Sequence, residues 1–369
     1  MILGTGVLSD RMIRVLVADG HIRNAKDANV SPASLDLSIS REIYRITSSA
    51  LPIKGQSIRD LMKILGAVPM HPGEIFEPGT MYLARANESF ALPDDIYGYC
   101  NPKSSVGRDG LLVRVITDGV DGFDSIPTGV SELTGKPRNP WFLISPTVMP
   151  IRMFPGETLA QVRFFTWDTR LDQQEMERLY RKQPLFFDES GKPIPWESVT
   201  CSKDGALAVT LDLRPGKVIG WRCKESRQVV DYSTTQKTEE YFDPVIADKN
   251  SGVLLKKGGF YILGTEQNIL VPPEFACEVK AVTKRYAHAD IHAAGFAEGG
   301  WGKRKDGRGL GRRITLEVWP HEDWYIQSGQ LIGELSYECM IEPPLVHYDE
   351  KETSHYRHQK GALPSKRFV

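Results

Sequence analysis

The chain has 369 residues, which favours two domains, and its 41% hydrophobic and 25% charged residues are the ordinary balance of a globular protein with sizeable cores. A formal net charge of −1 excludes a global positive field that would recruit nucleic acid or an anionic membrane. The N-terminus lacks a secretory signal pattern and no apolar run approaches a membrane span. We therefore expect a cytoplasmic protein that binds neither nucleic acid nor membrane.

Strand signals dominate the chain. Ser9 can cap a first helix that ends at Gly20, and an amphipathic helix is predicted over 171–183. Runs rich in β-branched and aromatic residues, bounded by glycine or proline, predict strands over 80–86, 111–117, 159–165, 258–265 and 313–319. The five cysteines lie far apart without a CxxC pair, which favours reduced, buried thiols. The chain is therefore predicted to be mainly β.

The chain also repeats itself in four segments that keep their order. The matched pairs are SLDLSISREI (34–43) with TLDLRPGKVI (210–219), GTMYLARANESFALP (79–93) with GGFYILGTEQNILVP (258–272), LLVRVITDGVDGF (111–123) with HADIHAAGFAEGG (288–300), and FPGETLAQVRFF (154–165) with QSGQLIGELSYE (327–338). The repeat predicts two copies of one β domain, over 1–168 and 200–345. A helical connector over 169–199 joins them, and a polar tail over 346–369 follows.

One loop of the first copy, PKSSVGRDG (102–110, the Ser/Arg loop), combines groups that bind oxyanions. Two hydroxyls, a glycine N–H and a guanidinium fork could hold phosphate oxygens, and they belong to Ser104, Ser105, Gly107 and Arg108. Alone, the pattern is weak, because a serine-rich turn with a surface arginine is the more common origin of such a segment. The second copy reads KAVTKRY (280–286) here, with Ala281 and Val282 in place of the hydroxyls, although Arg285 remains.

The second copy carries a carboxylate that the first copy lacks. The predicted strand RITLEVW (313–319) contains Glu317, and the first copy has Ile144 opposite it. Depending on the register of the strand, Glu317 faces an apolar interior, where desolvation would raise its pKa, or points outward to solvent. Trp301 and Trp319 could stack on a nucleobase or belong to the core.

Several catalytic chemistries lack their sequence patterns. Zinc-dependent nucleobase deaminases need His and Cys ligands in HxE and PCxxC segments, and neither segment is present. There is also no GxSxG elbow and no Walker A loop. We therefore expect a hydrolytic step that uses no zinc and no other catalytic transition metal.

Taken together, four segments resemble the successive motifs of the dCTP deaminase family. They are VSPASLDLSIS (30–40), PKSSVGRDGLLVRV (102–115), ITLEVWPHEDWYIQSGQLIGELSYE (314–338) and YRHQKGALPSKRF (356–368). The resemblance covers most of the chain, as a fused and duplicated version of a normally single-domain sequence. It implies two tandem dUTPase-like β-barrels of the β-clip or jelly-roll type, with a few short helices.

The resemblance implies hydrolytic deamination of dCTP to dUTP with release of ammonia. In the family, the Ser/Arg loop of one subunit meets the glutamate of its neighbour, so the fused copies are expected to build one composite site. Glu317 would be the general acid and base, Ser104 would reach the reacting water, and Arg108 would hold phosphate. Whether the chain is a monomer with this intrachain site or a homo-oligomer stays open.

The resemblance also assigns a wider set of substrate-binding positions. They are Lys103, Ser105, Gly107, Asp121, Ala294, Glu298, Tyr348, His355 and Gln359. His355 replaces a lysine of the family, and Glu298 replaces an aspartate that persists in the first copy as Asp121. Mg²⁺ is expected to accompany the triphosphate of the dCTP substrate, with no metal ligand from the protein.

Two alternatives to dCTP deamination remain at this point. A dUTP pyrophosphatase, or an enzyme with both activities, would use the same scaffold, although it would favour a glycine-rich tail where this chain has QKGALPSKRF (359–368, one glycine). A non-catalytic nucleotide-sensing protein is the third class.

The basic insert KRKDGRGLGRR (303–313) is either a solvated hairpin tip or an attractor of the triphosphate.

Overall fold

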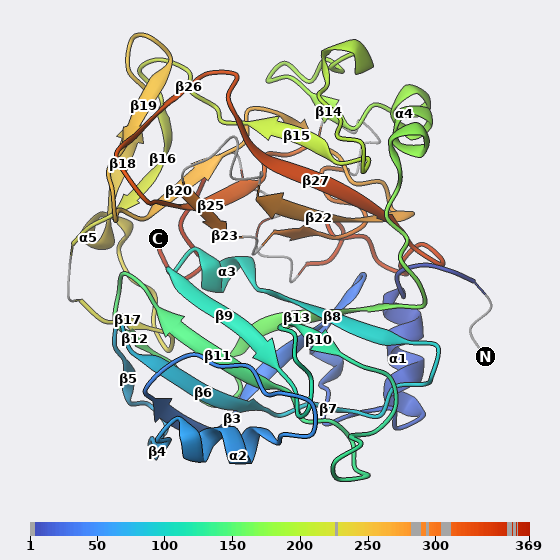
Figure 1. The fold of residues 1–369 in the computed structure, drawn as a ribbon. Helices are drawn as coiled ribbons and strands as arrows, with labels where there is room; N and C mark the ends of the chain where they lie inside the picture. Colours follow the sequence, from blue (N-terminus) through green and yellow to red (C-terminus); the bar gives the residue numbers. More distant parts are fainter. Residues whose placement is uncertain are drawn as a thin grey trace. The chain divides into compact units, whose positions relative to one another are not determined.

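The computed structural model describes residues 4–225, 228–281, 289–292, 295–303, 311–352, 356, 359 and 361–369. The chain forms two compact units (Figure 1). Within the described ranges, unit 1 comprises residues 4–168, 228–236 and 369, and unit 2 comprises 169–225 and 237–368. No helix in these ranges combines the length and apolar character needed to span a bilayer.

Unit 1 is built on a twisted sheet with strand order β10-β8-β13-β3-β6-β11-β9, and β2 and β4 also pair with β3. Two small sheets, β17-β12-β5 and β1-β7, complete it. Its elements are α1 (Asp10–Ala18), β1 (Ile22–Arg23), the 3₁₀ turn η1 (Asp27–Asn29), β2 (Val30–Ser31), β3 (Ser34–Ile46), α2 (Ile58–Ile64), β4 (Val68–Pro69), β5 (Ile75–Phe76), β6 (Met81–Ala86), β7 (Ser89–Phe90), β8 (Tyr97–Pro102), α3 (Ser104–Gly107), β9 (Leu111–Ile116), β10 (Ser125–Ile126), β11 (Trp141–Pro146), β12 (Ile151–Arg152), β13 (Thr158–Phe165) and β17 (Val230–Asp231).

Unit 2 contains the sheets β15-β27-β22-β24 and β18-β16-β20-β25-β23, with the pairs β19-β26 and β14-β21. Its elements are α4 (Gln173–Lys182), β14 (Phe186–Phe187), the 3₁₀ turn η2 (Trp196–Ser198), β15 (Leu207–Thr210), β16 (Val218–Cys223), α5 (Thr238–Tyr241), β18 (Phe242–Ile246), β19 (Gly252–Leu255), β20 (Tyr261–Gly264), β21 (Asn268–Ile269), β22 (Phe275–Ala281), β23 (Ala289–His292), β24 (Phe296–Ala297), β25 (Thr315–Pro320), β26 (Trp324–Gln327) and β27 (Leu331–Cys339). The mainly β architecture predicted from the sequence is confirmed.

Both predicted helices are confirmed and begin at side-chain caps. The hydroxyl of Ser9 accepts the Met12 N–H at the start of α1. At the start of α4, Asp172 and Glu175 form a capping box. The buried face of α4, with Met176 and Tyr180, packs into the hydrophobic core of unit 2. The predicted connector over 169–199 therefore contributes core side chains to unit 2.

One side-chain hydrogen bond recurs at equivalent positions of the two predicted copies. In unit 1 the hydroxyl of Tyr82 accepts the Glu77 N–H at 2.8 Å, and in unit 2 the hydroxyl of Tyr261 accepts the Lys256 N–H at 2.8 Å. Both tyrosines lie at the same place in the aligned segments 79–93 and 258–272. These two matching bonds therefore show which residue of β6 corresponds to which residue of β20.

That register corrects the residue opposite Glu317. Next to the matched tyrosines, Leu83 of β6 pairs with Leu143 of β11, whereas Ile262 of β20 pairs with Glu317 of β25. The first copy therefore has Leu143, and not the predicted Ile144, at this strand position. A shift of one residue along a strand moves the side chain to the other face of the sheet. The counterpart of Glu317 in the first copy therefore lies on the face that carries Leu143 and not on the face that carries Ile144.

The first repeat anchor is also out of register. Ser38 pairs with Thr158 beside a bulge in β13, and Thr210 pairs with Leu331 beside a bulge in β27. The Ser38 N–H is accepted by Glu88, and the Thr210 N–H is accepted by Gln267, which follows the same pattern. Ser38 thus corresponds to Thr210, and the LDL match at 35–37 and 211–213 is coincidental.

Candidate functional site

The Ser/Arg loop forms one tight helical turn between β8 and β9. Lys103 has extended backbone angles and caps α3, and the Arg108 N–H donates to the Ser104 carbonyl at 3.0 Å. Ser105 and Arg108 are 4% and 3% exposed. The alternative of a serine-rich turn with a surface arginine is therefore wrong, because the guanidinium is buried.

The first cation of the loop is already paired. The Lys103 ammonium forms an ion pair with Asp36 of β3, and both side chains are largely shielded from solvent. The sheet brings the two residues close, since Asp36 and Asn101, which precedes Lys103 by two residues, both pair with Gln161 of β13. A phosphate group that reaches Lys103 would share this cation with a carboxylate, so Lys103 stays a predicted ligand whose positive charge is partly balanced by Asp36.

Asp121 does not join the loop in unit 1. It is an exposed residue in the turn after β9, and the six residues of β9 separate it from α3. A strand of that length spans about 20 Å. Asp121 and Arg108 therefore lie beyond opposite ends of β9, and Asp121 stays a predicted substrate-binding residue.

Glu317 lies in the middle of β25 and faces away from the core of unit 2. Its neighbours Leu316 and Val318 belong to that core, so the strand's alternation puts Glu317 on the opposite face. Glu317 is nevertheless only 2% exposed. The solvent-facing alternative is therefore wrong, because the carboxyl group is buried, on the face of the sheet opposite the core of unit 2.

The C-terminal tail lies over the face of the sheet that carries Glu317. The Gln359 amide donates to the Thr315 hydroxyl at 2.7 Å, and Thr315 shares the face of Glu317 two residues away. Further along the tail, the indole N–H of Trp221 on β16 donates to the Ala362 carbonyl at 3.0 Å. The structure thus brings the predicted Gln359 close to Glu317.

Two other predicted residues meet at the end of β24. Glu298 is 5% exposed and directly precedes Gly299, whose carbonyl accepts the Tyr348 N–H at 3.1 Å. The Tyr348 ring lies 5.1 Å from the ring of Trp301. Trp301 itself belongs to the core of unit 2. Trp319 stacks on Phe260, with ring centres 4.6 Å apart.

Some predicted positions lie outside the described residues. They are Ala294, His355, Val282 and Arg285. In the strand pairing of unit 2, Ala281 pairs with Gly333. In unit 1, Pro102 pairs with Ala160, which lies at the matching position beside the bulge. Ala281 therefore corresponds to Pro102 and does not stand opposite a loop serine. The true counterparts of Ser104 and Ser105 fall beyond the described part of β22.

Arg312 is a residue that the sequence did not single out. Its guanidinium donates to Asp349 at 2.6 Å and to the Tyr356 carbonyl at 2.9 Å, and it lies 5.0 Å over the Trp301 ring. The ion pair is well shielded, with side-chain exposures of 12% and 7%. Arg312, at the end of the basic insert, therefore anchors the tail, whereas residues 304–310, which make up most of the insert, lie outside the described ranges.

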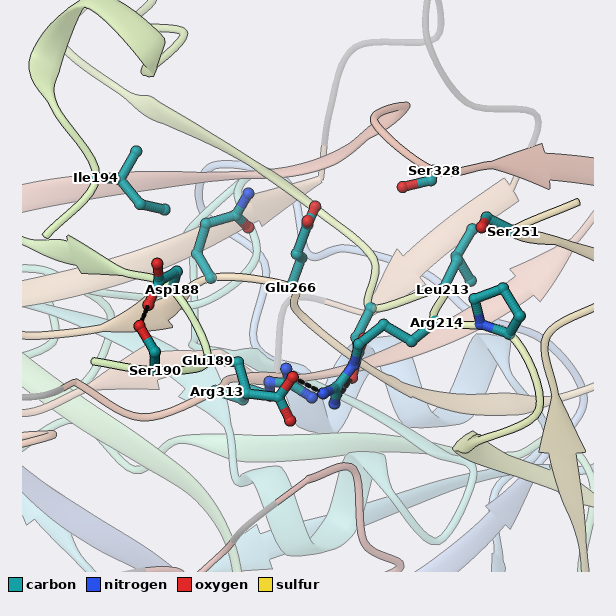
Figure 2. Close-up of a pocket in the computed structure, with 13 residues that line it drawn as sticks. Asp188, Glu189, Ser190, Ile194, Leu213, Arg214, Ser251, Glu266, Arg313 and Ser328 are labelled. Carbon is teal, nitrogen blue, oxygen red and sulfur yellow. Dashed lines mark hydrogen bonds and ion pairs between the residues drawn. The ribbon is translucent and has the colours of Figure 1, made fainter. Parts of the chain in front are cut away.

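A pocket of about 620 Å³ lies elsewhere in unit 2 (Figure 2). Arg214 donates to both carboxylate oxygens of Asp212, at 2.6 and 2.7 Å, and Arg313 also pairs with Asp212. Burial raises the pKa of Asp212, while Arg313 opposes the shift. Glu189 and Glu266 add further negative charge to the wall. Because its cations are neutralised internally, we do not assign a triphosphate to this pocket.

No group of three or more His, Cys, Asp or Glu side chains within the described ranges could hold a metal ion. All five cysteines are free thiols. Burial raises the pKa of the Cys223 thiol to about 12, which makes it a poor nucleophile.

Comparisons with known proteins identify the family. The N-terminal domain model of 2'-deoxycytidine 5'-triphosphate deaminase matches residues 4–168, and its C-terminal domain model matches residues 172–368. The chain therefore belongs to the dCTP deaminase family of enzymes. This membership confirms the resemblance that the sequence motifs indicated.

Individual relatives agree with this assignment. The chain is 30% identical to "dCTP deaminase, dUMP-forming" of Beutenbergia cavernae over 164 residues, which are 43% of this chain and 79% of that protein. A protein of the same name from Acidothermus cellulolyticus is 30% identical over 167 residues, again 43% and 79% of the two chains. The crystal structure of 2'-deoxycytidine 5'-triphosphate deaminase from Agrobacterium tumefaciens superposes with a TM-score of 0.80 at 31% identity, covering 93% of this chain and all of that one. That similarity extends over both units, as expected of a double-length member.

Proposed function

We propose that this protein deaminates dCTP hydrolytically, with Glu317 as the proton-transfer group and the Ser/Arg loop as the triphosphate clamp. The observation that carries the proposal is the burial of both groups, at 2% for Glu317 and 3% for Arg108, in a chain of the dCTP deaminase family. Burying a charged group costs free energy, and buried titratable or charged groups gather at functional sites. Proton transfer and phosphate binding are the uses that deamination of dCTP would make of these two groups.

The reaction adds one water molecule to dCTP and yields dUTP and ammonia. Glu317 removes a proton from the water that attacks C4 of cytosine, delivers a proton to the ring nitrogen N3, and assists departure of the amino group as ammonia. The Ser104 hydroxyl orients the water. General acid–base catalysis of this kind contributes roughly 10²- to 10⁴-fold. No zinc ligand takes part in this scheme.

The triphosphate is held by charge-assisted hydrogen bonds. Arg108 and the Ser105 hydroxyl face its oxygens, and Lys103 adds a cation that it shares with Asp36. Mg²⁺ fits best as an ion carried by the phosphate oxygens, since the described residues offer no cluster of three ligands. The tail, held over the Glu317 face by Gln359, limits water at the reacting base.

A second candidate concerns the product. The curated relatives are named "dUMP-forming", so an enzyme that also removes pyrophosphate from the deaminated nucleotide is the runner-up. Such an enzyme would release dUMP and pyrophosphate together with ammonia. The two candidates share the deamination step and differ only in cleavage of the bond between the α- and β-phosphates.

One experiment separates the candidates. Purified protein is incubated with dCTP, CTP, dCMP or dUTP and Mg²⁺, and ammonia, pyrophosphate and the nucleotide products are quantified. The proposal expects ammonia and dUTP from dCTP. Ammonia with pyrophosphate and dUMP supports the runner-up instead. If no substrate releases ammonia, the proposed activity is wrong. Pyrophosphate from dUTP then identifies a dUTP pyrophosphatase, and binding of dCTP without any product identifies a nucleotide sensor.

A further inference from the structure

A segment from the second copy belongs to unit 1. Residues 228–236 lie in sequence between β16 and α5 of unit 2, but they are part of the first unit. Here β17 pairs in parallel with β12, with Val230 opposite Ile151. Main-chain bonds at both ends fix the segment, from Val230 N–H to Pro150 and from Tyr232 N–H to Arg152, each at 2.9 Å.

This segment presents Tyr232 to the Ser/Arg loop. Its hydroxyl donates to a carboxylate oxygen of Asp109 at 2.8 Å. Asp109 is fully buried and Tyr232 is 8% exposed. Hydrogen bonds to charged groups are the strong ones, and a shielded environment strengthens them further. The bond therefore holds Asp109 against a strand that is itself tied into unit 1.

Asp109 directly follows Arg108, and its own backbone closes the loop. The Asp109 N–H donates to the Val106 carbonyl at 3.1 Å, and the next N–H, of Gly110, donates to Gly107 at 2.9 Å. Gly110 has a φ of +68°, where a side chain would be strained. Its carbonyl accepts both the N–H and the hydroxyl of Thr147, at 2.9 and 2.6 Å. The backbone that carries Arg108 is thus held on its C-terminal side.

We propose that Tyr232 is a positioning residue for the triphosphate clamp. By holding Asp109, its hydroxyl sets the backbone from which Arg108 and the two loop serines reach the phosphate oxygens. The inference rests on the proposed function, because it needs a triphosphate as the ligand. It follows that the loop of the first copy depends on a residue that the second copy supplies. A chain that ends after the first domain lacks this residue.

The test compares two tyrosine variants. Tyr232→Phe keeps the ring and removes only the hydroxyl, and Tyr82→Phe does the same to a buried tyrosine whose hydroxyl accepts a backbone N–H elsewhere in unit 1. With dCTP as substrate, we expect Tyr232→Phe to raise KM about 5- to 50-fold while kcat changes less than about threefold, because a bond to a charged group is lost outside the reacting atoms. Tyr82→Phe should lower the unfolding temperature without changing KM.

The outcomes separate the inference from the proposed function. If the wild-type protein releases no ammonia from dCTP, the proposed function is wrong and this inference goes with it. If the wild type is active and Tyr232→Phe has the wild-type KM, or shares the behaviour of Tyr82→Phe, only the role of Tyr232 is overturned. Hydrogen exchange of residues 103–110 in the nucleotide-free protein gives a second readout, and it should accelerate only in Tyr232→Phe.

A second pair of variants covers failure to fold. Removing the phenol leaves the buried carboxylate of Asp109 without this donor, which can destabilise unit 1. Asp109→Asn is then compared with Asp109→Asn/Tyr232→Phe, because a neutral amide accepts the same bond and tolerates its loss better. A dCTP dissociation constant that is at least fivefold larger in the double variant than in Asp109→Asn supports the positioning role. Equal dissociation constants in these two variants overturn it.

Discussion

Replacing Arg312 with alanine should release the C-terminal tail. The change removes the bonds to Asp349 and to the Tyr356 carbonyl, together with the contact over Trp301. Breaking a buried ion pair by removing one partner costs about 3–5 kcal/mol. Because side-chain exposures of 12% and 7% leave some access to water, we take the lower end. About 3 kcal/mol corresponds to a roughly 150-fold increase in the population with the tail detached.

Limited proteolysis measures this population directly. When opening is fast relative to cleavage, the cleavage rate follows the open fraction, so cuts within 345–369 should appear roughly 150-fold faster in Arg312→Ala. Arg181→Ala is the matched control, because Arg181 also binds two oxygen groups, the carboxylates of Glu177 and Glu197, but is 52% exposed. Exposed pairs contribute about 0–1 kcal/mol, so the control should resemble the wild type. Equal cleavage of Arg312→Ala and wild type would refute the anchoring role.

Three further predictions concern the loop, the copies and pH. Arg108→Ala should weaken dCTP binding roughly 10- to 150-fold in calorimetry, whereas Arg285→Ala should change it little, and the reverse order would assign the clamp to the wrong copy. Mixing inactive Ser104→Ala with inactive Glu317→Gln should restore no activity if both groups of one site come from one chain, and recovery after subunit exchange would exclude that arrangement. Burial raises the pKa of Glu88, opposed by its bonds from Ser38, so the stability that it contributes is present below the ordinary value of 4.5 and is lost as pH rises through the folded-state pKa. In urea unfolding, the stability of wild type relative to Glu88→Gln should therefore fall between pH 4 and pH 8, and a rise would contradict the sign.

Local patterns in the sequence predicted the elements well. The cap at Ser9 and the strand character of the runs depend on near neighbours, and the structure bears them out. Exact register was harder to predict. The LDL match at 211–213 gave an alignment that differs from the observed strand pairing. The reason is a Pro-Gly turn at 215–216, which separates β15 from β16, whereas the first copy has one continuous strand, β3.

The supporting residues of the site could not be predicted from a single sequence. Tyr232 lies 123 positions from Asp109, and Arg312 lies 37 positions from Asp349. No periodicity or motif relates such pairs, since only the folded chain brings them together. For the same reason, the sequence identified Lys103 as a cation but gave no sign that Asp36 neutralises it.

The central claim is that Glu317 transfers the protons of deamination, and Glu317→Gln tests it most directly. Glutamine keeps the size of the side chain and a hydrogen-bonding amide on β25 but cannot exchange a proton. We predict that ammonia release from dCTP falls roughly 10²- to 10⁴-fold while the dCTP dissociation constant, measured by calorimetry on the same preparation, stays within about threefold of wild type. Turnover within about tenfold of wild type at unchanged affinity would remove Glu317 from the mechanism.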